Sequence, residues 1–265
     1  MLLAIRYKEV IDYEQYPFTE EIVTAIKMKQ HLKSVYEKCL ENPVVLNEKT
    51  LVIGFAETAT ALGHAFFNMF DGKLAYIHTT REKVYGQTPI ISFEEEHSHA
   101  TSHRIYAEDR QLFMSYKNII LVDDEMTTGQ TNINIIKQIK KTYPHIERFS
   151  VVSILDWRNR EQRKAYRQLE QTLNITIDEV TLMAGEIYVE GAITEEEYQR
   201  ERVYTPTAVE YFEHTLPSVL TYPSKSEDNQ LCLDPYFKGT GRFSMTVSQK
   251  QIYNEEIKEL STKLC

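Results

Sequence analysis

Cysteine is scarce in this sequence of 265 residues, which contains only Cys39, Cys232 and Cys265. Their wide spacing matches neither a zinc pattern nor the disulfide framework of a small secreted domain. Basic residues are outnumbered, because 30 Lys and Arg face 39 Asp and Glu for a net charge of −9, so the basic footprint of a nucleic-acid-binding protein is missing. No apolar run is long enough for a membrane span or a signal-peptide core. We therefore expect a cytoplasmic protein with reduced thiols and with neither a nucleic-acid nor a membrane partner.

The composition is that of an ordinary globular protein, with 42% hydrophobic and 26% charged residues. Apolar runs typical of buried strands alternate with runs of helical periodicity. This alternation predicts an α/β fold, in which a parallel twisted sheet carries helices on both faces. Residues 1–18 show no regular pattern, and Thr19 is expected to cap the first helix. The expected strands cover residues 51–53, 74–79, 119–122, 149–155 and part of 175–189, and the expected helices cover residues 19–40, 59–70, 130–143 and 159–172.

The most informative stretch is residues 119–131, Ile-Ile-Leu-Val-Asp-Asp-Glu-Met-Thr-Thr-Gly-Gln-Thr. Four apolar residues predict a buried parallel strand that ends in two adjacent carboxylates, Asp123 and Asp124. A hydroxyl-rich turn then leads into a helix, whose first turn offers N–H groups and a positive dipole end to a phosphate. Gly129 permits a positive φ and a close approach of the backbone. Carboxylates beside a phosphate cradle suit a ligand with vicinal hydroxyls and a phosphate, such as a ribose 5-phosphate.

This stretch resembles the 5-phosphoribosyl-1-pyrophosphate (PRPP) binding motif of type I phosphoribosyltransferases. That motif has four apolar residues, two acids, two or three variable residues and Thr-Thr-Gly-x-Thr, and every position is matched here. The resemblance implies that Asp123 and Asp124 hold the ribose hydroxyls and serve the Mg²⁺ that accompanies PRPP. It also implies that the 5-phosphate is wrapped by Thr127, Thr128, Gly129, Gln130 and Thr131.

The same resemblance implies an enzyme that transfers the phosphoribosyl group from PRPP to a nucleobase-like acceptor and releases pyrophosphate. In this family a small-residue loop after the first strand binds pyrophosphate, and Ala56, Glu57 and Thr58 stand at that place. Arg81 follows the next strand, where an arginine suits bidentate contact with a phosphate. Lys83 is the weaker choice there.

Residues 84–102 form a long segment with little periodicity, at a place where type I enzymes carry a loop that closes over the site. It contains His97 and His99 and is followed directly by His103, and the spacing of the three fits no standard zinc pattern. The alternatives to a lid are a solvated surface loop and a metal site. A further hypothesis is that a histidine of this loop acts as a general base. The Glu-Glu-His-Ser-His-Ala run at 95–100 resembles orotate phosphoribosyltransferase-like proteins of tellurite-resistance operons.

Trp157 is the only tryptophan and follows the expected strand at 149–155. A flat side chain at this point could stack on an acceptor base, although packing explains it equally well. The family further implies a small hood over the sheet and a homodimer. The base itself stays open, and a purine acceptor is an alternative to an orotate-like one.

Two other interpretations remain open. A module on the same fold could bind PRPP or a nucleotide without catalysis. A receiver-like domain would use paired acids for magnesium and Asp156 as phosphoacceptor, but it leaves the clustered threonines unexplained.

The character of the chain changes near residue 196, where an acidic segment gives way to Tyr, Thr, Pro and Ser. We therefore expect a phosphoribosyltransferase-like domain over residues 1–195. Residues 196–265 would be an appendage or a partial second domain, in which Gly241-Arg242-Phe243 resembles a motif of the relatives' second domain.

Overall fold

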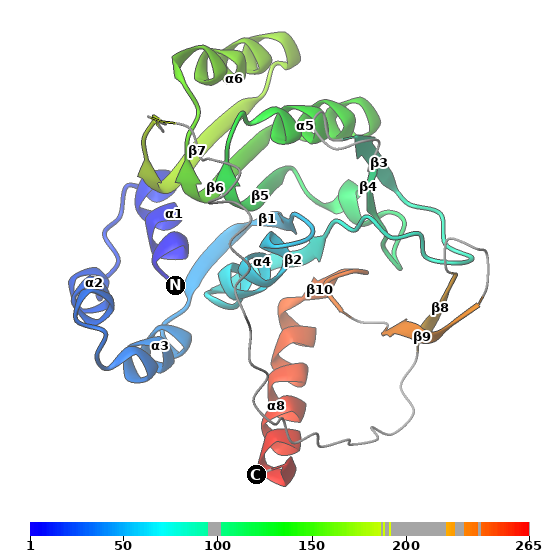
Figure 1. The fold of residues 1–265 in the computed structure, drawn as a ribbon. Coiled ribbons are helices and arrows are strands. Elements are labelled where there is room, and N and C mark those ends of the chain that lie inside the picture. Colours follow the sequence, from blue (N-terminus) through cyan, green and yellow to red (C-terminus); the bar gives the residue numbers. More distant parts are fainter. Residues whose placement is uncertain are drawn as a thin grey trace.

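The computed structural model describes residues 1–94, 102–186, 188, 191, 221–225, 231–237 and 240–264 of the chain. Helices and strands alternate along most of this length (Figure 1). The helices are α1 (Leu2–Asp12), α2 (Thr19–Met28), α3 (Leu32–Glu41), α4 (Ala59–Asn68), the 3-10 helix η1 (Leu112–Ser115), α5 (Gln130–Thr142), α6 (Arg160–Leu173) and α8 (Val247–Leu264). The strands are β1 (Val44–Gly54), β2 (Phe70–His78), β3 (Ile91–Glu94), β4 (Ser102–Ile105), β5 (Asn118–Met126), β6 (Arg148–Asp156), β7 (Thr176–Ala184), β8 (Thr221–Lys225), β9 (Leu231–Phe237) and β10 (Met245–Thr246).

Within the described residues, a six-stranded sheet has the order β10-β2-β1-β5-β6-β7. The strands from β2 to β7 in this order pair in parallel, whereas β10 pairs with β2 in antiparallel orientation. The two short pairs β3–β4 and β8–β9 are antiparallel and lie outside this sheet. The α/β fold predicted from the alternating pattern is confirmed.

Helices cover both faces of the sheet, and the strand residues alternate between the two cores. Leu51 and Ile53 of β1 pack in the core that also holds residues of α5, α6, β3 and β4. Val52 between them packs in the core shared with residues of α1, α2, α3 and α4. Burial on both faces explains why these parallel strands read as continuous apolar runs.

Three expectations for the amino-terminal part of the chain are wrong. Residues 1–18 are not irregular throughout, because α1 buries Leu3 and Ile5 against the sheet core. The expected helix over 19–40 is two helices, since the chain adopts positive φ at Lys29 and His31. Thr19 is not the cap: it is the first residue of α2, and its hydroxyl donates to the Tyr16 carbonyl at 2.9 Å.

Two further boundaries differ from the prediction. The helix expected to reach Phe70 ends at Asn68, and Asp71-Gly72 lies inside β2 instead of stopping a helix. Part of the segment over 84–102 is regular, because β3 pairs with β4 from Ile91↔Ile105 to Glu94↔Ser102. His97 and His99 lie outside the described residues, so their expected place in a lid stays a prediction.

The connections create a crossover point beside β1. The chain runs from β1 to its neighbour β2, and then crosses to β5 on the other side of β1. At such a reversal of strand order the loops at the carboxyl ends diverge and leave room for a ligand. The motif at 123–131 and the loop at 56–58 both leave the sheet at this point.

The end of the described chain packs against the same sheet. Met245 of β10 pairs with Tyr76 of β2. Lys250 of α8 donates to the Phe70 carbonyl at 2.8 Å and lies over the Phe67 ring. Among the helices of the described residues, none has the length and apolar character that crossing a membrane requires.

Candidate functional site

Backbone hydrogen bonds tie the loops together at the carboxyl edge of the sheet. They connect the ends of β2, β1, β5 and β6, which are neighbours in the sheet. The bonds run from Thr79 N–H to Gly54 O (2.9 Å), from Phe55 N–H to Val122 O (3.1 Å) and from Trp157 N–H to Met126 O (2.8 Å). The predicted site residues that follow these strands therefore share one edge of the molecule.

Asp123 and Asp124 lie within β5, which extends four residues beyond the apolar run to Met126. Both side chains are half-buried, and the Asp124 N–H donates to the Asp123 carboxylate at 3.0 Å. Consecutive side chains of a strand point to opposite faces. Ile119 and Leu121 of β5 pack in the core with α5, and Ile120 and Val122 pack in the core with α4.

The predicted phosphate turn is the start of α5. Gly129 is the residue before the helix and has a φ of 77°, and Gln130 is the first helical residue. The Thr128 hydroxyl accepts the Gln130 N–H at 3.2 Å. Thr127 is exposed, whereas Thr128 and Thr131 are half-buried. The strand–turn–helix setting that the motif requires is therefore present.

A side chain of α6 holds Gly129 in position. The Tyr166 hydroxyl donates to the Gly129 carbonyl at 3.0 Å. A Cβ atom on Gly129 would lie 2.7 Å from that hydroxyl and 2.8 Å from Cδ of Arg158. Only glycine satisfies both the positive φ and this close contact, so α6 fixes the position of the turn.

The loop at 56–58 joins β1 to α4 and carries a cis peptide bond between Ala56 and Glu57. Glu57 and Thr58 are exposed, and Ala56 is half-buried. The Ala56 N–H donates to the Thr79 hydroxyl at 2.8 Å. The Thr60 hydroxyl donates to the Glu57 carbonyl at 2.8 Å, which closes the loop onto the first turn of α4.

A buried polar relay connects this loop to Arg81. The Thr79 hydroxyl lies 3.0 Å from Nδ1 of His103, and Nε of Arg81 donates to Nε2 of the same ring at 3.4 Å. His103 is fully buried on β4 and packs on Phe93. The sequence placed His103 on a mobile loop, and that is wrong. The buried ring contacts Arg81 and Thr79 and does not face solvent.

A family model described as phosphoribosyl transferase matches residues 17–186, which is more than half of the chain. The chain belongs to the phosphoribosyl transferase family. It is therefore a phosphoribosyltransferase, and the receiver-like alternative is wrong. A search among curated proteins found no match.

The chain is similar to several solved structures of phosphoribosyltransferases. One is adenine phosphoribosyltransferase from Rhodothermus marinus, with 15% identity, 63% of this chain and 86% of that chain covered, and a TM-score of 0.33. Another is the Giardia lamblia enzyme in complex with 9-deazaadenine, with 14% identity, 71% and 99% covered, and a TM-score of 0.34. A hypoxanthine phosphoribosyltransferase from Staphylococcus aureus has 10% identity, 47% and 60% covered, and a TM-score of 0.26.

Replacing Thr79 by valine in this phosphoribosyltransferase tests the relay. Valine keeps the shape but leaves the Ala56 N–H and Nδ1 of His103 without the hydroxyl. We expect the free energy of unfolding to fall by about 1–3 kcal/mol, because buried polar groups lose their partner. Urea unfolding measures this loss, and hydrogen exchange at the Ala56 amide should become faster. Thr79→Ser keeps the hydroxyl and should behave like the parent protein; an equal loss in both variants would contradict the relay.

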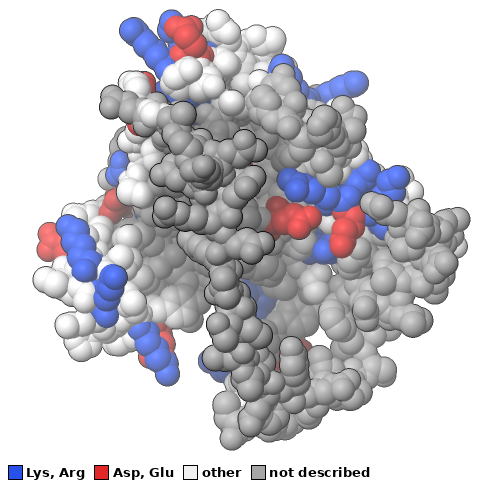
Figure 2. Space-filling view, in the orientation of Figure 1, with Lys and Arg blue, Asp and Glu red and all other residues white. Residues whose placement is uncertain are grey.

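Arg81 lies half-buried after β2, and a second arginine supports its backbone. Nη1 of Arg104 donates to the Arg81 carbonyl at 2.6 Å. Figure 2 shows basic side chains next to acidic ones over the part of the molecule where Figure 1 places β4. Lys83 is exposed. The structure therefore anchors Arg81 more firmly than Lys83 beside the loop at 56–58.

Trp157 follows β6, as the sequence predicts, and its side chain is half-buried. Its indole N–H donates to Oε2 of Glu125 at 3.3 Å. Glu125 was not among the predicted site residues, because its place in the motif is variable. The pair puts an aromatic face and a carboxylate side by side at the edge where β5 and β6 end.

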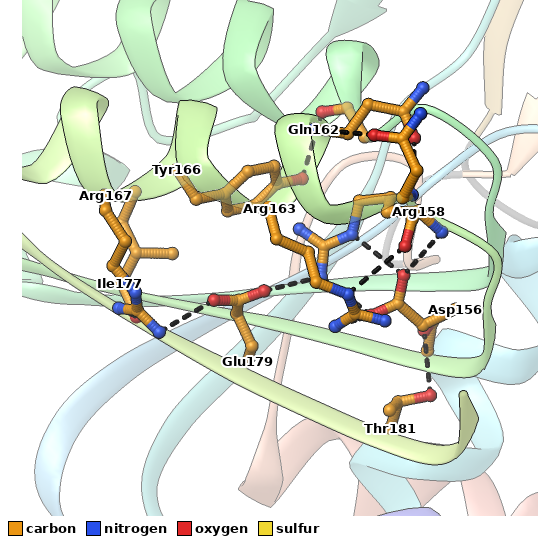
Figure 3. A network of polar contacts seen from close by, with 12 residues as sticks. Asp156, Arg158, Gln162, Arg163, Tyr166, Arg167, Ile177, Glu179 and Thr181 are labelled. Atoms are coloured by element: carbon orange, nitrogen blue, oxygen red, sulfur yellow. Dashed lines mark hydrogen bonds and ion pairs between the residues drawn. The ribbon is translucent and has the colours of Figure 1, made fainter. Parts of the chain in front are cut away.

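A buried ion-pair network lies next to the turn at 127–131. The Arg158 side chain is fully buried, pairs with Asp156 at 2.8 Å and Glu179 at 2.6 Å, and lies 4.3 Å above the Tyr166 ring. Figure 3 shows Arg163 completing the network from α6. Burial alone would raise the pKa of the Asp156 carboxyl, but the hydrogen bonds and charge of Arg158 lower it below its usual range. Asp156 is thus a structural anion.

His78, the last residue of β2, should make the stability of the fold depend on pH. Burial lowers its pKa to about 4 from 6.5, although the Thr79 carbonyl, 2.8 Å from its Nδ1, opposes the shift. The folded state therefore binds this proton less readily than the unfolded state. The part of the free energy of unfolding that depends on neutral His78 should be fully present above pH 6.5. It should be lost as the pH drops from 6.5 to about 4, by about 3 kcal/mol in total. Urea unfolding at pH 7 and pH 4.5 measures the loss, and it should be smaller in His78→Asn. An identical loss in that variant would exclude His78 as its source.

Proposed function

We propose that this phosphoribosyltransferase transfers the 5-phosphoribosyl group of PRPP to a nitrogen of a nucleobase-like acceptor and releases pyrophosphate. The observation that supports this most strongly is the junction of β5 and α5. Two carboxylates, a hydroxyl-rich turn and a helix start meet there at the crossover point of a parallel sheet. The loop at 56–58 lies beside them on the neighbouring strand.

The acids would bind the sugar and the turn would bind its phosphate. Breaking the bond at the anomeric carbon builds oxocarbenium character on the ribose, as in glycoside cleavage. Asp123 and Asp124 would hold the ribose hydroxyls and face that positive charge. Thr127, Thr128, Gly129, Gln130 and Thr131 would offer hydroxyl and backbone donors to the 5-phosphate.

Pyrophosphate would bind one strand further along the edge. Ala56, Glu57 and Thr58 would present the backbone of the loop, and Arg81 would add positive charge. The relay through His103 supports Arg81 in this role. The segment over residues 84–102, which includes β3, would act as a lid.

Magnesium fits the donors at this edge. No group of three His, Cys, Asp or Glu side chains that could cage a metal occurs within the described part of the chain. Mg²⁺ is commonly bound by one or two carboxylates and by substrate phosphates, so Asp123 and Asp124 with PRPP would be an appropriate set. The ion would neutralise charge on the departing pyrophosphate.

Trp157 would stack on the acceptor base, with Glu125 holding the indole in place. The Glu-Glu-His-Ser-His-Ala run at 95–100 supports a relationship to the orotate phosphoribosyltransferase-like proteins of tellurite-resistance operons. The adenine and hypoxanthine enzymes found among solved structures make purines a second class of acceptor to test.

We further propose a homodimer, which the resemblance implies, and a cytoplasmic location, which the few widely spaced cysteines favour. Residues 1–195 would form the catalytic domain with its hood. Residues 196–265 would be the appendage, of which residues 240–250 pack against the sheet.

A screen of nucleobases with PRPP and Mg²⁺, monitored by pyrophosphate release, tests the proposed function. We expect release that depends on both PRPP and one base. Binding of PRPP in calorimetry without turnover of any base would instead support a non-catalytic sensor on the same fold. Absence of PRPP binding would contradict both.

A further inference from the structure

The segment 240–246 brings a third arginine to the carboxyl end of β2. Because β10 runs antiparallel to β2, the turn that precedes β10 lies where β2 ends. The His78 N–H donates to the Gly241 carbonyl at 2.8 Å there. This segment lies outside residues 17–186 that match the family model. Arg242 thus reaches the candidate site from outside the matched residues, in a stretch whose resemblance to a motif of the relatives' second domain assigns it no function.

Close packing fixes the backbone of this turn. A Cβ on Gly241 would lie 2.4 Å from the Tyr76 ring and 2.7 Å from Nε2 of His64. On the other side Phe243 is buried with Val84 and Tyr106. The base of the Arg242 side chain is therefore held on both sides, which limits the freedom that a ligand contact would have to remove.

Arg242 makes two contacts with the loop after β2. Its Nη1 donates to the Thr80 hydroxyl at 2.6 Å and to Oε2 of Glu82 at 2.9 Å. The Glu82 side chain is 54% exposed and that of Arg242 is 21% exposed. An ion pair with so exposed an acid is worth little, so a more highly charged anion can replace Glu82 without a large penalty.

Positive charge outweighs negative charge around this contact. Arg81 lies between Thr80 and Glu82 in the chain, and the Thr80 backbone is bridged to Arg104. Three arginines thus come from three separate segments to one short loop, where they outnumber the carboxylates of Glu82 and of Glu108, whose N–H donates to the Phe243 carbonyl at 3.4 Å. Like charges at close range repel unless an anion joins them, and planar guanidinium groups are suited to phosphate oxygens.

We propose that Arg242 binds the outer phosphate of pyrophosphate in place of Glu82, so that the carboxyl-terminal segment completes the leaving-group site. This inference rests on the proposed function. Along the sheet edge the ligand would then run from the 5-phosphate at α5, past the ribose at β5 and the pyrophosphate loop at β1, to Arg242 beside β2. Glu82 would hold the arginine in position until pyrophosphate arrives.

Binding of inorganic pyrophosphate and of ribose 5-phosphate, each with MgCl₂, tests this inference by calorimetry on the full chain. Arg242→Gln should weaken pyrophosphate binding about 10- to 100-fold, as expected for a lost charge-assisted contact, and leave ribose 5-phosphate binding unchanged. Glu82→Gln should tighten pyrophosphate binding, because it removes the competing carboxylate. Arg110→Gln, an exposed arginine on another turn, is the matched control and should change neither affinity.

Arg242→Gln and Glu82→Gln together distinguish a contact with pyrophosphate from a contact that only stabilises the fold. If Arg242 and Glu82 only stabilise the turn, both substitutions lose the same ion pair and pyrophosphate binding changes in the same direction or not at all, which would overturn the inference. Should Arg242→Gln fail to fold, Arg242→Lys and Glu82→Gln decide the same question. If the unmodified chain binds ribose 5-phosphate but Arg242→Gln keeps its affinity for pyrophosphate, only this inference fails. If the unmodified chain binds neither compound, the proposed function fails as well.

Discussion

Replacing both Asp123 and Asp124 by asparagine should lower kcat/KM for PRPP by about 100- to 1,000-fold or more. Loss of one preorganised group at a developing charge costs about 3–4 kcal/mol, and this change removes two negative charges that would face the oxocarbenium-like ribose. Asparagine keeps the size of each side chain and the acceptor for the Asp124 N–H. The fold should therefore persist, and steady-state kinetics with a base that supports turnover measures the effect.

The matched control is Asp71→Asn. Asp71 is also a half-buried carboxylate on a parallel strand, but it lies near the amino end of β2, away from the motif. Its oxygen accepts the Gly72 N–H at 2.7 Å, and asparagine can keep that bond. We expect unchanged kinetics in this variant. Equal losses at both places would show that Asp123 and Asp124 act through general charge and not through contact with the sugar.

Gly129→Ala should raise KM for PRPP about tenfold or more, because the phosphate turn must move. The new Cβ would meet Tyr166 and Arg158 at less than 3 Å, and the φ of 77° adds strain of about 1–2 kcal/mol. Misplacing a group that positions substrate by about 1 Å costs on the order of 100-fold in rate. Thermal unfolding and steady-state kinetics together measure the two effects.

Gly191→Ala separates the strain from the clash. Gly191 also has a positive φ, of 94°, but nothing lies within 4 Å of a Cβ built on it. This control should lose only the stability that belongs to a strained backbone and should keep its KM. If Gly129→Ala shows no larger change in KM than Gly191→Ala, the support of the turn by α6 is not important for binding.

The motif was predictable because its information is local. A four-residue apolar run, two acids and a glycine before a helix lie within 13 residues, and each has a direct structural meaning. The alternation of strands and helices likewise predicted a parallel sheet. Both features depend on neighbours in the chain, so one sequence is enough to find them.

The contacts that support the motif were not predictable, because they join distant parts of the chain. His103 meets Thr79 across 24 positions, and Arg242 meets Thr80 across 162. A histidine in a run of polar residues looks like part of a solvated loop until β4 is known to bury it. The same is true of Tyr166, whose contact with Gly129 depends on how α6 packs against α5.

The most direct test of the central claim is a crystal structure of the chain with ribose 5-phosphate and Mg²⁺. Our account predicts that the phosphate lies at residues 127–131, within hydrogen-bonding distance of the backbone at the start of α5. It also predicts that the ribose hydroxyls contact Asp123 and Asp124. A sugar phosphate bound elsewhere, or one whose hydroxyls point away from both carboxylates, would contradict it.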